Sequence, residues 1–207
     1  MYFFTHLFIS KVLYKHFKKE IQLDKWAFAY GNIKPDLPPA CFGDRHTLEN
    51  YFFIVYDQAN QLMHDDITLP EYSVKLGEVC HFVCDFFCYY HLNDHLHKKI
   101  FSHLIYEIRL HFQLCTLRFK KKLEFPSDLT APKKGFAAIL YELRREYFSN
   151  PQSMKRDIDY ALSAAVWTFK TILYFTKYSL DTAWLPGIRL PARLQAKGGS
   201  YESSIIC

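Results

Sequence analysis

The stretch HFVCDFFCYYHLNDHLHKKIFSHLIYE, residues 81–107, says most about how this chain folds and what it binds. His81 and Asp85 are four residues apart, and so are His103 and Glu107, which places each pair on one face of a helix. Both pairs stand in runs of Phe, Tyr, Leu, Ile and Cys, where a polar side chain is costly to bury without a partner. A metal cluster would satisfy both pairs.

His91 extends the first pair into the pattern His-x3-Asp-x5-His. If the helix continued, the ten residues from His81 to His91 would leave these two side chains about 80° apart. His91 would then lie on a flanking stripe, within reach of a second metal ion. Nitrogen and carboxylate donors in such numbers suit zinc, at three or four ligands per ion.

Three further candidates lie upstream. Asp36 and His46 belong to the proline- and glycine-rich segment AYGNIKPDLPPACFGDRHT, residues 29–47, which is expected to be largely irregular. His6 follows Thr5 on the first helical turn. The candidate metal ligands are therefore His6, Asp36, His46, His81, Asp85, His91, His103 and Glu107, with Asp36 also the candidate catalytic residue.

Each candidate alone has a simpler interpretation, and only their combination favours a metal site. An isolated histidine can pack against or cap a helix end, an aspartate after proline is often a turn residue, and a His/Glu pair is often a solvated helix face. His95 or His97 could replace His91 if the register of that loop differs. Cys80, Cys84 and Cys88 form another helical stripe, typical of small core residues, with a thiolate zinc site as the alternative.

Composition predicts one ordered, all-α domain. Of the 207 residues 18% are aromatic and only seven are glycine, which is typical of a densely packed chain. A single helical bundle is expected over residues 1–190, with a flexible tail at 191–207. The expected helices run from Thr5 to about Glu20, from 47 to 65, from 71 to 90, through His103 to about 122, from 136 to 148 and from 153 to 180.

Charge and hydropathy limit the possible partners. A net charge of +5 is mild and is no nucleic-acid signature by itself. The most apolar window, Ala161 to Leu180, contains Lys170 and Lys177, so no transmembrane span is expected. The apolar N-terminal run precedes its basic run, the reverse of a secretory signal, which predicts a cytoplasmic location.

The motifs together resemble the zinc-dependent phospholipase C family of bacteria. The matching pieces are THLFI at 5–9, GNIKPDLP at 31–38, RHT at 45–47, HFVCDFFCYYH at 81–91 and HLIYE at 103–107. No motif after about Leu123 contributes to the resemblance.

The resemblance implies a site for two to three zinc ions at the mouth of a helical bundle. Asp36, His46, His81 and Asp85 would hold one ion, and a second would lie on His91, His103 and Glu107. A third would use His6 with Asp85 bridging, completed in the family by the chain's own terminal amine and carbonyl. Here Met1 stands five residues before His6.

The activity implied is hydrolysis of a phospholipid to diacylglycerol and a phosphorylated headgroup by a zinc-activated water. The partner would be a phospholipid or other phosphodiester, with possible peripheral membrane contact. Choline-specific members carry an acidic residue near the N-terminus, and the MYFFT segment before His6 has none. Choline specificity therefore does not follow.

Two other interpretations stay open. Single-strand-specific zinc nucleases share the His-x3-Asp-x5-His element, but they usually end in His-x3-Asp after a Gly-Gly-Asn stretch. This chain has Glu107 and no such stretch, which makes nucleic acid the less favoured substrate. The third interpretation is a zinc-binding protein that has lost catalysis.

Overall fold

A computed structural model describes residues 1–37, 46–64, 67–92, 100–120, 122–123 and 135–182. The described residues contain no strand, which confirms the all-α prediction. The helices are α1 (Phe3–Phe17), α2 (Lys25–Gly31), α3 (Leu48–His64), α4 (Leu69–Asp85), α6 (Ile100–Phe119), α7 (Phe136–Ser149) and α8 (Met154–Thr182), with 3₁₀ turns η1 (Lys34–Asp36) and η2 (Tyr89–His91).

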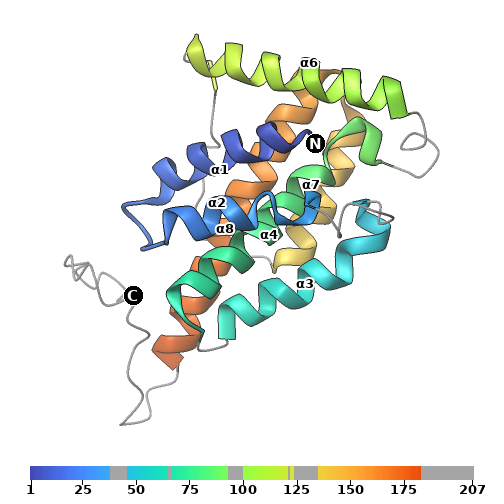
Figure 1. Cartoon of the computed structure of the whole chain (residues 1–207). Coiled ribbons are helices and arrows are strands. Elements are labelled where there is room, and N and C mark those ends of the chain that lie inside the picture. The colour runs from blue at the N-terminus through green and yellow to red at the C-terminus, as the bar shows by residue number, and fades with distance from the viewer. Residues whose placement is uncertain (38–45, 65–66, 93–99, 121, 124–134, 183–207) are drawn as a thin grey trace.

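Helices α4 and α8 lie at the centre of the bundle (Figure 1). Helices α1 and α2 pack on one side of them, α3 and α7 on the other, and α6 crosses one end close to the N-terminus. Because α4 is surrounded by other helices, its second half is buried. Every residue from Leu76 to Asp85 is buried. The polar ligands on α4 are therefore held in the hydrophobic core.

Local sequence signals define both ends of α4. The Thr68 hydroxyl accepts a hydrogen bond from the Glu71 amide, and Pro70 stands in the first turn, where its missing N–H costs nothing. At the other end the buried Arg144 guanidinium from α7 donates to the Phe86 carbonyl. The helix therefore ends with Asp85 in its last turn.

Two glycines let α2 lie directly on α4. A Cβ at Gly31 would come within 2.1 Å of the Val74 carbonyl oxygen, and one at Gly77 within 2.6 Å of the Phe28 carbonyl oxygen. Only glycine allows this approach, because it has no Cβ. The contact brings the Asn32 backbone beside α4, where it meets a site residue.

The structure corrects three of the expected boundaries. Helix α4 ends at Asp85 and not near residue 90, so His91 belongs to η2. Helix α1 begins at Phe3, and the Thr5 hydroxyl lies 3.3 Å from His111 Nδ1 and does not cap the helix. Residues Lys25–Gly31, partly expected to be irregular, form α2, whose start is capped by the Asp24 carboxylate.

Some expectations lie outside the described residues. These are the tail at 191–207 and the alternative ligands His95 and His97. Among the helices that are described, none has the length and hydropathy needed to cross a bilayer.

Candidate metal centre

Asp85 lies at the centre of a buried cluster of basic groups. Its Oδ1 accepts from the Met1 amine and lies 3.1 Å from His6 Nε2. Its Oδ2 lies 3.1 Å from His46 Nδ1, 3.4 Å from His81 Nε2 and 3.5 Å from His91 Nδ1. A fully buried carboxylate with partners on both oxygens is well placed to bridge two cations.

The first set of donors, here called the inner group, is Asp36, His46, His81 and Asp85. His81 Nε2 lies 3.0 Å from His46 Nδ1, and Asp36 Oδ1 lies 3.7 Å and 3.9 Å from these two nitrogens. Asp36 comes from η1, His46 precedes α3, and the other two are on α4. The irregular segment therefore supplies half of the inner group.

The Asn32 carbonyl sets the tautomer of His81. It lies 2.9 Å from His81 Nδ1, and a carbonyl oxygen can only accept, so Nδ1 carries the proton and donates it. The lone pair of Nε2 is then directed at the cluster. A metal-bound imidazole is commonly held in this way by a partner on its other nitrogen.

The second set, here called the outer group, is His91, His103 and Glu107. Glu107 Oε1 lies 2.9 Å from His91 Nε2 and 2.7 Å from His103 Nε2, and the two nitrogens are 3.2 Å apart. His91 comes from η2 and the other two from α6. The Tyr90 ring stacks on His103, with centroids 5.2 Å apart.

A third set of donors joins the two groups. The His6 ring stacks on His81 at 3.8 Å, and its Nδ1 is buried without a hydrogen-bond partner among the described residues. The Met1 amine lies 3.1 Å from His91 Nε2 and 3.3 Å from Glu107 Oε1. This amine folds back to the cluster although it stands five residues before His6.

The spacing of these donors fits zinc. In a tetrahedral site with bonds of about 2.0–2.1 Å, neighbouring ligand atoms lie about 3.3 Å apart. The ring nitrogens of His46 and His81, and those of His91 and His103, are 3.0 Å and 3.2 Å apart. Three sets of donor atoms each converge within 4.8 Å, namely His6, His81 and Asp85; Asp36, His46 and His81; and Cys88, His91 and Glu107.

The local electrostatics keep His6, Asp85 and Glu107 in the protonation states that bind a metal ion. Burial, together with neighbouring His81, lowers the pKa of His6 to about 4, so His6 is neutral at pH 7. Burial would raise the pKa values of Asp85 and Glu107, but the basic groups around each carboxyl hold them well below their usual range. Burial lowers the pKa of His81, yet Asp85 outweighs burial and raises it. The Asp85 and Glu107 carboxylates are therefore charged and favour cations beside them.

Asp157 on α8 accepts hydrogen bonds from both chain segments that carry the outer group. Its Oδ2 accepts from the Tyr89 amide at 2.7 Å and from the Tyr106 hydroxyl at 2.8 Å, and its Oδ1 accepts from the Tyr147 hydroxyl at 2.9 Å. Tyr89 begins the turn that carries His91, and Tyr106 precedes Glu107. One buried carboxylate therefore positions both segments of the outer group.

All eight sequence-predicted residues lie in this one cluster, but two details differ from expectation. His91 reaches the cluster because the chain turns after α4, and not from a flanking stripe of a continuing helix. Cys80, Cys84 and Cys88 are all buried in the hydrophobic core, as the preferred interpretation expected, but Cys88 Sγ also converges with donor atoms of His91 and Glu107. Burial raises the pKa of the Cys88 thiol, which favours its neutral, weakly ligating form.

Sequence reasoning missed the residues that hold the ligands in place. Asn32 acts through its carbonyl oxygen, which no side-chain pattern reveals, although it stands in the quoted segment beside Gly31. Asp157 stands 66 residues after His91 and carries no motif. The one feature of the sequence that could have indicated Asp157 is a carboxylate at the start of an apolar helical run.

A pocket of about 240 Å³ opens beside the inner group. It is lined by Lys34, Pro35, His46, Tyr51, Ile54, Gln58, Glu78 and Phe82. Asp36 follows Pro35 in the chain, its side chain is 22% exposed, and its Oδ1 lies 3.9 Å from Nδ1 of the pocket residue His46. A substrate can therefore approach the inner group from solvent.

Comparison with known proteins agrees with the geometry. Residues 5–159 match the zinc-dependent phospholipase C family, well past the last quoted motif at residue 107. Neither a curated protein nor a solved structure shows a significant match to the chain. The match covers most of the chain and includes all eight converging side chains, and the chain therefore belongs to the zinc-dependent phospholipase C family.

Proposed function

We propose that this protein is a phospholipase C that holds two to three zinc ions and hydrolyses a phospholipid to diacylglycerol and a phosphorylated headgroup. The observation that carries the proposal is the convergence of three carboxylates and five imidazoles at ligand-like spacings in one buried cluster. Burying so many ionisable groups without a cation to neutralise them would be costly.

The donor residues form three sets, and each set would hold one zinc ion. The inner group would hold one ion and the outer group a second. His6, with Asp85 shared, would hold a third. Zinc, when bound, lowers the pKa of water toward 7 and neutralises charge on a phosphoryl group.

Asp36 is the proposed general base. Its Oδ1 stands 3.7 Å from His81 Nε2, at the edge of the cluster, and its carboxylate is the most solvent-accessible of the three. A water molecule beside Asp36 would donate a hydrogen bond to this carboxylate and present its oxygen atom to the phosphorus of the substrate. Asp36 would orient this water and accept its proton, a role worth about 10²–10⁴-fold in rate.

The test is zinc-loaded protein incubated with phosphatidylcholine vesicles and, separately, with a soluble chromogenic phosphodiester. We expect diacylglycerol as the lipid product. Asp36→Asn should lower turnover by about 10²-fold or more. Asp57→Asn, an exposed aspartate on α3, is the matched control and should behave as wild type.

Two results would overturn the proposal. Turnover of single-stranded DNA without turnover of any lipid would support the nuclease interpretation instead. Zinc bound at the expected stoichiometry with no turnover of any phosphodiester would support a zinc-binding protein that has lost catalysis.

A further inference from the structure

Helix α6 has two apolar faces. Its inner face carries His103 and Glu107 and the buried Leu110 and Leu114. Its outer face carries Phe101, Ile105, Ile108, Phe112 and Phe119. At about 100° per residue these five side chains fall within about 60° of arc, so they form one straight stripe along the helix.

The stripe is strongly exposed. Phe101 is 82% exposed, Phe112 is 66% exposed and Phe119 is 89% exposed. Single exposed apolar residues are common on proteins, but an aligned row over a helix about 29 Å long marks an interaction surface.

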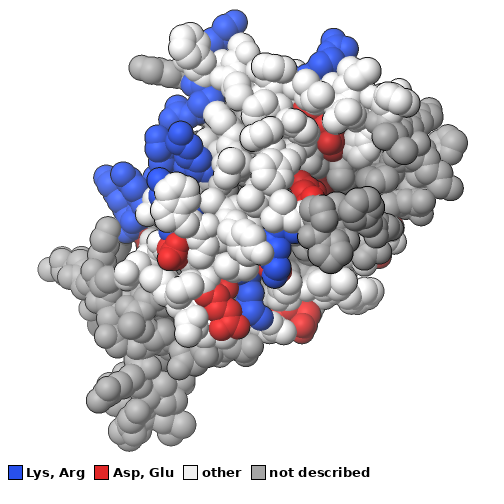
Figure 2. All heavy atoms as spheres, in the orientation of Figure 1, with Lys and Arg blue, Asp and Glu red and all other residues white. Residues whose placement is uncertain are grey.

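The exposed charged residues of α6 and of its neighbour α1 are all basic. Arg109, Arg118 and Lys120 lie exposed on α6 or directly after it, and Lys11 and Lys15 lie exposed on α1. The one acidic residue of α6, Glu107, is only 8% exposed, and α1 has none. Figure 2 shows the basic side chains along the edge that α1 and α6 form. Such a surface attracts anions and repels a second copy of itself.

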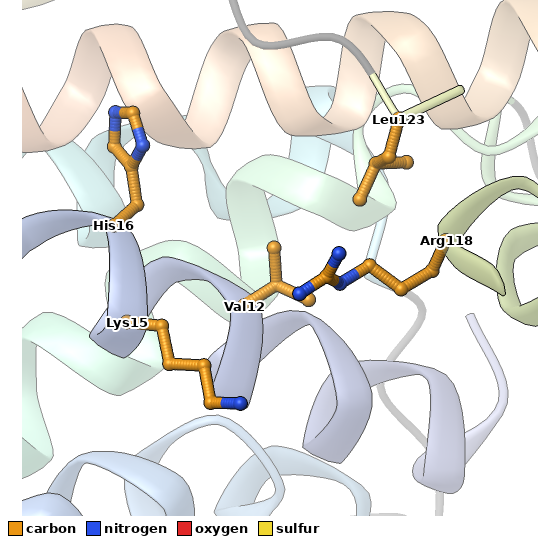
Figure 3. Close-up of a pocket in the computed structure, with 5 residues that line it drawn as sticks. All are labelled: Val12, Lys15, His16, Arg118 and Leu123. Carbon is orange, nitrogen blue, oxygen red and sulfur yellow. The ribbon is translucent and has the colours of Figure 1, made fainter. Parts of the chain in front are cut away.

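A basic pocket lies at the C-terminal end of the stripe. It has a volume of about 220 Å³ and is lined by Val12, Lys15, His16, Arg118 and Leu123. Arg118 reaches from α6 across to Val12 on α1, with Lys15 and His16 on the following turn (Figure 3). Lys15 and Arg118 are both exposed, and no salt bridge joins either of them to another described residue.

From these features we infer that the outer face of α6 is a docking surface for an anionic phospholipid bilayer, with the Arg118 pocket receiving a lipid phosphate at its end. Exposed aromatic and aliphatic residues flanked by Lys and Arg are typical of a helix that lies in the plane of a membrane interface. An acidic protein partner would satisfy the cations, but it would leave much of the aromatic stripe in water.

Docking in this way places the metal cluster close to the lipid. His103 and Glu107 lie on the opposite face of the same helix, so the outer group stands about one helix diameter, roughly 10 Å, from the bilayer surface. The inference rests on the proposed function and deepens it, because it names the surface that holds the protein at the membrane containing its substrate, while the pocket beside the inner group stays open to that substrate.

The test is flotation of the zinc-loaded full chain with vesicles of phosphatidylcholine alone or with phosphatidylglycerol added. Wild type should bind the anionic vesicles at least about tenfold more tightly, and salt should weaken the binding. The double variant Phe112→Gln/Phe119→Gln should bind about tenfold more weakly, since two inserting aromatic side chains are lost. Arg118→Gln should weaken binding about fivefold.

The matched control is Phe53→Gln/Phe148→Gln, on α3 and α7, where the two side chains are 79% and 58% exposed. It should bind vesicles as wild type does. Equal loss in this control, or no effect of the α6 variants, would overturn the inference. So would α6 variants that abolish a dimer detected by ultracentrifugation while vesicle binding is unchanged.

A soluble phosphodiester, turned over in parallel, separates the two proposals. Wild type that binds anionic vesicles but turns over neither lipid nor soluble substrate contradicts the proposed function alone. Wild type that turns over the soluble substrate but does not bind vesicles contradicts the docking surface alone. The α6 variants should keep wild-type turnover of the soluble substrate.

Competition with inorganic phosphate tests whether the Arg118 pocket binds the phosphate group of a lipid. If inorganic phosphate competes with vesicle binding in wild type but not in Arg118→Gln, the pocket binds the phosphate group itself. Phosphate binding that persists without any vesicle binding would contradict a lipid as its source.

Discussion

The inner and outer groups of the metal centre are built on different supports. His81 and Asp85 project from the central helix α4 and are fully buried, so the hydrophobic core itself positions them. His103 and Glu107 project from α6, whose opposite face is exposed, and they depend on the Asp157 network for their position. The position of the inner group should therefore depend on folding of the core, and the position of the outer group on the hydrogen bonds that Asp157 accepts from Tyr89 and Tyr106.

The largest effect should come from Asp85→Asn, which alters the residue that connects all donor sets. We expect the zinc content to fall to one ion or fewer and turnover to fall about 10³-fold or more, because a neutral amide bridges cations poorly. Metal analysis and turnover of a soluble phosphodiester measure both. Retention of two or more zinc ions in Asp85→Asn would show that this carboxylate is not the bridge.

The second prediction concerns pH and the buried His6. Its folded pKa of about 4 lies below the ordinary 6.5, so protonation favours the unfolded state. The free energy of unfolding of the metal-free protein should therefore fall as pH drops from 6.5 to 4, by about 3 kcal/mol from this residue.

His81 contributes with the opposite sign, because its folded pKa is raised: its stabilisation is present below pH 6.5 and is lost as pH rises through the folded pKa. Comparing wild type with His6→Gln by denaturant unfolding isolates the His6 effect. A His6→Gln variant with the same pH slope as wild type would contradict this account.

The third prediction addresses the outer group alone. His103→Gln should release one zinc ion, keep the others and lower turnover about 10²-fold. The His103 side chain is largely buried against Glu107, but a Gln amide can still donate a hydrogen bond to that carboxylate, so the free energy of unfolding of the metal-free protein should fall by only about 1 kcal/mol. Loss of every zinc ion in this variant would mean that the two groups are not separable.

The smallest effect is expected for Tyr106→Phe, which removes one hydrogen bond to Asp157. The outer group should bind its zinc about tenfold more weakly, as is typical when a partner behind the ligands is lost. Tyr56→Phe, on α3, is the control. A competition titration with a zinc chelator measures the affinity of the outer group for zinc. An unchanged affinity would contradict a positioning role for Asp157.

The sequence predicted the ligands better than their supports. Helical spacing of His81 with Asp85, and of His103 with Glu107, survives in the structure because each pair lies within one regular helix. The prediction that His91 lies on a continuing helix was wrong, because α4 ends at Asp85. At that end distant Arg144 donates a hydrogen bond to the Phe86 carbonyl, a contact that no local pattern reveals. The first helix is expected to begin at Thr5, whereas α1 begins two residues earlier, at Phe3.

The supports could not be predicted because they act over long separations in the chain or through the backbone. The Asn32 carbonyl reaches His81 only after Gly31 and Gly77 allow α2 to lie against α4. Asp157 meets Tyr89 and Tyr106 across 68 and 51 residues. Neither contact follows from a local pattern of residue types.

The most direct test of the central claim is anomalous diffraction at the zinc absorption edge from crystals of the zinc-loaded protein. The account predicts two or three peaks, each about 2.0–2.2 Å from donor atoms of His6, Asp36, His46, His81, Asp85, His91, His103 or Glu107. Absence of any peak within this cluster would contradict it.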